Sequence, residues 1–110
     1  MKDVQLGEVI ATRKLTLDGG TEVTVHVGRP CSPPEWNSNF YCPYQIIGLG
    51  SERVRRVGGV DSMQALVLAL EAIGADFYAY NKLQANKISW FDQSDLGFPI
   101  PDFAIDLGSE

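Results

Sequence analysis

The 110-residue sequence contains one histidine and two cysteines, which leaves little material for nucleophilic or metal chemistry. A histidine-dependent triad or general base would have to use His26, which strand alternation places with Thr24 on a solvent-exposed side. Cys31 and Cys42 alone cannot supply the full ligand set of a structural zinc site. We therefore predict free thiols, no cofactor, no metal site and no catalytic residue. A bridge between the two cysteines, which bracket one loop, is the alternative.

Long hydrophobic runs are also missing. The longest uninterrupted apolar stretch covers residues 65–70, whereas a membrane-spanning helix needs about 20 apolar residues. The first eight residues, MKDVQLGE, contain no apolar signal-peptide segment. A cytoplasmic protein that does not bind a membrane is therefore expected.

Basic residues are in the minority, with nine Lys and Arg against 14 Asp and Glu, a formal charge of −5 and a pI near 4.7. Because basic side chains carry most nucleic-acid affinity, we expect no nucleic-acid partner. The exception is a local cluster of Arg53, Arg55 and Arg56, in which Arg53 and Arg55 share one side of a predicted strand. We expect two of the three to line the open side of the sheet beside Arg13 or Lys14. There they would face an anion or pair with acidic residues of the C-terminal segment, residues 92–110.

The residues that are present suit one folded domain over residues 1–110, because 45% of them are hydrophobic and only 21% are charged. Alternating apolar and polar residues predict two β-hairpins, the first of which turns at Asp18-Gly19-Gly20. We expect an ordered core over about residues 8–105. In chain order the predicted elements are strands at 8–17 and 22–27, a proline-rich loop at 28–43, strands at 44–49 and 52–57, a helix at about 61–81, a short strand at 88–91 as an option, and an acidic strap at 92–110.

The predicted helix begins at Asp61, a favourable N-cap residue with Gln64 in the capping-box position. Gly74 either ends this helix or lies inside it, and we favour continuation to about Asn81. An apolar stripe at helical spacing is expected to lie on the sheet, and it consists of Met63, Leu66, Val67, Leu70, Ile73 and Phe77. The predicted fold class is therefore α+β: a four- or five-stranded antiparallel sheet, one long helix packed on one face and an irregular C-terminal strap.

Several segments together resemble a known family. They are RKLTLDGG (13–20), VGRP (27–30), CPYQI (42–46), GLG (48–50), GGVDSMQAL (58–66), ALEAIGAD (69–76) and DLGFP (95–99). The sequence is similar to a family of small bacterial proteins catalogued as domain of unknown function 6968, over about residues 8–99. This resemblance implies a stand-alone bacterial protein of this size, and it brings no established activity, cofactor or catalytic residue.

The acidity of the chain is concentrated in the strap. Residues 92–110 carry five of the 14 acids and none of the nine bases, so the remaining 91 residues are neutral. The acids that we single out in the strap are Asp92, Asp95, Asp102 and Asp106. Their spacing does not match an EF-hand loop, which favours a solvated segment over a cation site. A basic protein is the partner that this charge would attract.

Glu35 and Trp36 lie in the proline-rich loop, where a tryptophan either packs back on the body or anchors an interface. The sequence therefore favours a non-enzymatic, immunity- or antitoxin-like protein-binding module, a monomer or homodimer, that captures a basic partner. The alternative is a small enzyme or small-molecule-binding protein with a pocket between loop 28–43 and the strap.

Overall fold

A long antiparallel hairpin of β1 (Val9–Leu17) and β2 (Thr21–Gly28) opens the fold in a computed structural model that describes residues 4–100. The turn between the strands passes through Gly19 and Gly20, whose φ angles of 95° and 91° lie in the left-handed region that favours glycine. The first predicted hairpin is thereby confirmed, with strand limits within a residue or two of those expected.

The second hairpin starts earlier than the sequence suggested. Strand β3 (Phe40–Ile47) begins four residues before the predicted start at Tyr44, and β4 (Arg55–Gly59) begins and ends later than 52–57. The proline-rich loop shrinks accordingly to residues 29–39 and contains a short 3-10 helix at Pro34–Trp36. Pro43 was expected to be the last residue of the loop. In the structure it belongs to β3 and pairs with Arg56 of β4, beyond the last residue pair between β2 and β3. Proline is tolerated at such a position, because a neighbouring strand lies on one side of it only.

The sheet has five strands in the order β4-β3-β2-β1-β5, which confirms the optional fifth strand. Strand β5 (Ile88–Ser89) is shorter than the predicted 88–91 and pairs with the end of β1. It stops where Phe91 and Asp92 adopt positive φ angles of 51° and 62°, which no regular strand permits.

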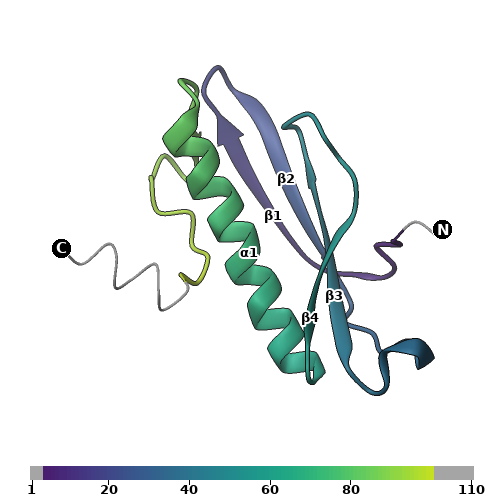
Figure 1. The fold of residues 1–110 in the computed structure, drawn as a ribbon. Coiled ribbons are helices and arrows are strands. Elements are labelled where there is room, and N and C mark those ends of the chain that lie inside the picture. Colours follow the sequence, from purple (N-terminus) through teal and green to yellow (C-terminus); the bar gives the residue numbers. More distant parts are fainter. Residues whose placement is uncertain (1–3, 101–110) are drawn as a thin grey trace.

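Helix α1 (Ser62–Leu83) crosses one face of this sheet (Figure 1). Asp61 is its N-cap, because the Asp61 carboxylate accepts a hydrogen bond from the Gln64 backbone N–H at 2.8 Å. The Gln64 side chain accepts from the Val60 N–H, one residue before the position expected of a capping box. The helix continues through Gly74 as predicted and ends two residues beyond Asn81. No helix in residues 4–100 is both long enough and apolar enough to cross a membrane.

The face that α1 presents to the sheet differs from the predicted stripe. Met63 and Val67 are 74% and 44% exposed, and the small residues Ala65 and Ala69 are buried in their place. Alanine at these positions lets the helix backbone approach the sheet closely, which turns the bulkier side chains outward. The core that results contains Leu15, Val23, Val25, Val27, Cys42, Tyr44, Ala65, Ala69, Ile73, Phe77, Ile88, Leu96 and Phe98.

The first part of the strap, residues 92–100, runs back along α1 and is yellow-green in Figure 1. Leu96 is fully buried and the Phe98 ring lies 5.6 Å from that of Phe77. The Cβ of an alanine at position 74 would lie 2.8 Å from the Phe98 Cβ, so Gly74 is what allows the strap to lie directly on the helix. The expectation that the chain is ordered to about residue 105 falls outside the described residues.

Of the two basic residues considered for the open side, Lys14 is exposed there, whereas Arg13 lies on the helix side of the sheet beneath the strap. Its guanidinium carbon is 4.0 Å from the centre of the Trp90 ring and 5.0 Å from that of Phe98. Its Nη1 donates to the carbonyls of Leu96 and Gly97 at 3.1 and 3.0 Å. Strand alternation puts Arg13 on the same side as buried Leu15, where the ring of Trp90 and the ring of Phe98 in the strap pack against its charge.

Candidate binding sites

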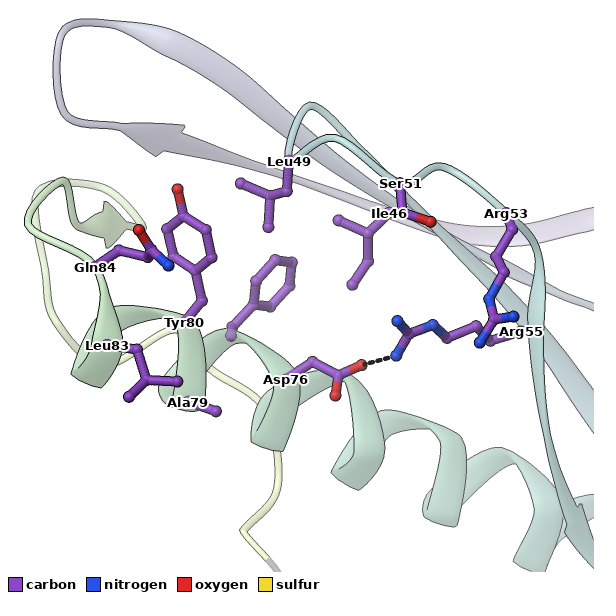
Figure 2. A pocket seen from close by; sticks show the side chains of 11 residues that line it. Ile46, Leu49, Ser51, Arg53, Arg55, Asp76, Ala79, Tyr80, Leu83 and Gln84 are labelled. Atoms are coloured by element: carbon purple, nitrogen blue, oxygen red, sulfur yellow. Dashed lines mark hydrogen bonds and ion pairs between the residues drawn. The ribbon is translucent and has the colours of Figure 1, made fainter.

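A groove of about 300 Å³ lies between the C-terminal half of α1 and the connection from β3 to β4 (Figure 2). Its two arginines come from the strand side and its acid from the helix, and apolar side chains form the rest of the wall. The lining residues are Ile46, Leu49, Ser51, Arg53, Arg55, Asp76, Phe77, Ala79, Tyr80, Leu83 and Gln84.

The charged end of the groove is built around Asp76. The Asp76 Oδ2 accepts a hydrogen bond from the Tyr44 hydroxyl at 3.0 Å and lies 3.3 Å from the Arg55 Nη1. The side chains of Arg55 and Asp76 remain 47% and 38% exposed, so this ion pair stabilises the fold by at most about 1 kcal/mol. Arg53 points to the same end of the groove (Figure 2), and no ion pair involves it among residues 4–100.

Tyr44 supports this arrangement from below, where its ring belongs to the buried core. Burial raises the pKa of Tyr44, and the neighbouring Asp76 carboxylate raises it further. The phenol therefore stays protonated around neutral pH and keeps donating its hydrogen bond to Asp76.

The predicted placement of Arg53 and Arg55 on the open side is wrong. Both line the groove on the helix side, and the acid that pairs with Arg55 comes from α1 and not from the strap. Strand alternation explains the result, because Arg55 pairs with buried Tyr44 and so shares its side of the sheet. Of the three arginines, Arg56 is the one on the open side.

A second cluster lies on the open side of the sheet, where Trp36 of the loop packs over β3 and β4. The rings of Trp36 and Tyr41 are 5.3 Å apart, and the Arg56 guanidinium carbon is 5.3 Å from the centre of each ring. Gly58 makes room for this arrangement, since a Cβ there would be 3.2 Å from the Trp36 Cζ3. Trp36 is half-buried and thus combines the two alternatives, packing back on the body while keeping part of its ring exposed. We call Trp36, Tyr41 and Arg56 the aromatic–arginine cluster.

The loop residues also line a hollow of about 550 Å³, but they share it with the N-terminal residues 5–8. The strap 92–100 is on the far side of the molecule from the loop (Figure 1). The pocket between loop 28–43 and the strap that we considered is therefore not formed by the described residues. Glu35 is exposed beside Trp36.

The candidates for nucleophilic chemistry are kept apart. His26 is on the open side of β2, and its Nδ1 shares a hydrogen bond with the Thr12 Oγ1 at 2.9 Å. Cys42 is buried on the helix side and Cys31 is exposed in the loop, and both are free thiols, as predicted. Burial raises the pKa of Cys42 to about 11, so it is protonated at neutral pH and unreactive.

Two of the four strap acids, Asp92 and Asp95, lie within the described residues. Asp95 accepts hydrogen bonds from the Gly97 N–H at 2.9 Å and from the Tyr78 hydroxyl at 3.5 Å, which shape the turn before Phe98. Asp92 is exposed. Asp102 and Asp106 lie outside the described residues. No group of three or more His, Cys, Asp or Glu side chains gathers within residues 4–100.

Sequence reasoning missed the helix side of the groove, namely Asp76, Tyr80 and Leu83. One signal was present in the sequence: Asp76 lies between Ala72 and Tyr80 at helical spacing, so the three side chains share one side of the helix, and in the structure all three are half-buried. An acid in such a row suggests a partner on the neighbouring strand. Identifying that partner as Arg55 required the register between β3 and β4.

The described residues thus form an α+β domain, a five-stranded antiparallel sheet with one helix. The chain belongs to the family described as a domain of unknown function (DUF6968), whose model matches residues 11–100. Searches of curated proteins and of solved structures found no match to the chain.

Proposed function

We propose that the protein is a non-enzymatic protein-binding module that docks its partner on the aromatic–arginine cluster. The observation behind this proposal is the position of Arg56, 5.3 Å from the ring centres of both Trp36 and Tyr41, on the side of the sheet that α1 leaves open. Tryptophan, tyrosine and arginine are the residues that most often dominate the energy of protein interfaces.

The cluster is ordered before a partner arrives. Trp36 is seated over Gly58 and against Tyr41, and its backbone N–H and C=O are hydrogen-bonded to Pro33 and Asn39 within the loop. A partner would therefore bind rings that are already in place, which reduces the conformational entropy lost on association.

The partner that we propose has a net positive charge. The folded body supplies Glu35 next to the cluster. The chain also carries five acids and no base from residue 92 onward, and these contribute to long-range attraction through the net charge of −5 and not to contacts at the cluster. Complementary charge of this kind accelerates encounter and excludes acidic competitors. An immunity- or antitoxin-like role, in which a small acidic protein captures a basic one, would use such charge complementarity. The protein would act as a monomer or a homodimer.

Affinity capture tests the proposal directly. The full-length protein and its Trp36→Ala, Arg56→Gln and Arg53→Gln variants are immobilised, and each is exposed to lysate of the source cells. We expect a basic protein that wild type and Arg53→Gln retain and that Trp36→Ala and Arg56→Gln lose. The purified partner should then bind Trp36→Ala on the order of ten-fold or more weakly than wild type.

Arg53→Gln is the matched control, because it removes the same charge from the opposite side of the sheet. Circular dichroism melts confirm that every variant is folded. A purified partner whose Kd is the same for wild type, Trp36→Ala and Arg56→Gln would refute docking on the cluster, as would specific retention of nucleic acid alone.

A further inference from the structure

We propose that the groove between α1 and the β3–β4 connection binds a small amphipathic monocarboxylate. The carboxylate would lie between Arg53 and Arg55, and its apolar chain would lie along Leu49, Tyr80 and Leu83. This is a second site, on the opposite side of the sheet from the aromatic–arginine cluster.

The charge of the groove selects an anion. Arg53 and Arg55 contribute two positive charges and Asp76 one negative charge, so the lining has a net charge of +1 in a chain whose total is −5. Asp76 is already engaged by Arg55 and by the Tyr44 hydroxyl. A second carboxylate would balance the remaining charge, and the planar guanidinium of Arg53 can hold both of its oxygens.

The other charged groups near the groove make their hydrogen bonds outside it. Glu52 precedes Arg53, but its Oε2 accepts a hydrogen bond from the Gly48 N–H at 3.2 Å and the residue does not line the groove. The last carbonyls of α1 carry partial negative charge. The Lys87 ammonium donates to those of Asn81 and Gln84, which neutralises this end of the helix.

The rest of the lining suits an apolar chain of limited length. Figure 2 shows Leu49 and Tyr80 facing the groove away from the arginines, with Leu83 and Gln84 at its far end. The volume of about 300 Å³ is at the small end of the range for ligand sites. A single excess positive charge beside this apolar wall favours a monoanion over a phosphate dianion.

Octanoate is the probe for the test, with octan-1-ol and octylammonium as ligands of equal chain length and different charge. Each is titrated into the full-length protein by calorimetry and followed by amide chemical shifts. We expect octanoate to bind with a Kd on the order of 0.1–1 mM. The shifts should be centred on Leu49, Arg53 and Tyr80, and both other ligands should bind at least several-fold more weakly.

Three variants separate the groove from a general surface effect. Arg53→Gln should weaken octanoate binding about ten-fold, whereas Arg56→Gln, on the open side of the neighbouring strand, should leave it unchanged. Asp76→Asn should strengthen it several-fold, because Arg55 is then free to bind the ligand; a purely structural role of Asp76 would not produce this gain. Equal binding of octanoate and octan-1-ol, equal effects of the two arginine variants, or shifts outside the groove would each overturn the proposal.

Discussion

Arg13 shows how one side chain can hold two segments that are distant in the sequence. Its guanidinium is packed between the rings of Trp90 and Phe98 and donates to the carbonyls of Leu96 and Gly97. A cation enclosed by aromatic rings and satisfied by carbonyls contributes through stacking and through charge-assisted hydrogen bonds together. The strap is therefore attached to β1 by this single residue as well as by its buried apolar side chains.

Replacing Arg13 should consequently lower the free energy of unfolding, by less for lysine than for alanine. Arg13→Lys keeps the charge but loses the planar stacking and the paired donation, and should cost about 1 kcal/mol. Arg13→Ala should cost about 2 kcal/mol. Urea denaturation measures both values. Lys14→Ala, on the exposed side of the same strand, is the control and should change stability by less than about 0.5 kcal/mol; equal costs at positions 13 and 14 would contradict the role given to Arg13.

Cys42 should make the free energy of unfolding decrease with pH in the alkaline range. Burial raises its pKa from the usual 9.0 to about 11. The unfolded chain therefore ionises first, and the stabilisation that is complete below pH 9 is lost as the pH rises toward 11. The free energy of unfolding should fall by about 1 kcal/mol between pH 8 and 10 from this group. The pKa of Tyr44 is also raised, from 10.0, and adds a further decline above pH 10.

Denaturation at several pH values checks this expectation. Cys42→Ala should be less stable than wild type at pH 8 because of the cavity, yet it should lose less stability between pH 8 and 10. Cys31→Ser removes an exposed thiol and should follow the wild-type curve. Parallel pH curves for wild type and Cys42→Ala would show that the buried thiol is not the group responsible.

At the scale of elements, the contact between α1 and the strap depends on Gly74. Alanine inside a helix is normally more stable than glycine by about 1 kcal/mol. At position 74 its Cβ would meet the Phe98 Cβ at 2.8 Å. Forcing a methyl group into such a contact costs about 1–3 kcal/mol. We therefore expect Gly74→Ala to lower stability by about 1 kcal/mol in spite of the gain in helix propensity.

A double-mutant cycle separates the two effects. Phe98→Gly removes the opposing Cβ, so Gly74→Ala in that background should stabilise the protein and recover the helix propensity. The coupling free energy between the two positions should be about 1–3 kcal/mol. If Gly74→Ala has the same effect with and without Phe98, the close approach of strap and helix is not what requires glycine.

The helices, strands and turns were predictable from the sequence where a pattern of a few adjacent residues determines the structure. The hairpin turn at Gly19 and Gly20 and the helix start at Asp61 were correct, because turn chemistry and capping depend on a few adjacent residues. The early start of β3 was not predicted, because Pro43 reads as a loop residue unless the number of its strand neighbours is known. The buried row of Ala65 and Ala69 was overlooked for a similar reason: hydrophobic size favours Met63, whereas packing distance favours alanine.

The candidate sites were predictable only in part, because each combines residues from several elements. Trp36 and the arginine pair Arg53 and Arg55 were identified from residue type alone. Their sides were not: alternation correctly separated Arg53 and Arg55 from Arg56, but it does not show which side of the strand the helix covers. Asp76 became part of the groove, with Tyr44 hydrogen-bonded to it, only when the helix was placed over β3 and β4, which is a matter of tertiary packing.

For the whole molecule, the two proposed sites are on opposite sides of one sheet and share no lining residue. Thermodynamic linkage requires any influence of one ligand on the other to be reciprocal. Arg55 and Arg56 are consecutive residues of β4, but they point to opposite sides of the sheet and share no partner, so we expect the two ligands to influence each other little. The two sites are separated by strands β3 and β4, whose helix-side residues Cys42 and Tyr44 are packed in the buried core.

We therefore expect the sites to act independently. Trp36→Ala should leave the Kd for octanoate within about two-fold of wild type, and saturating octanoate should leave the Kd of the captured protein partner equally unchanged. Arg53→Gln should weaken octanoate binding without affecting the partner. Calorimetric titrations with each ligand, alone and in the presence of the other, measure all of these quantities. A reciprocal change of more than about five-fold would mean that β3 and β4, which carry residues of both sites, shift as a unit when either ligand binds.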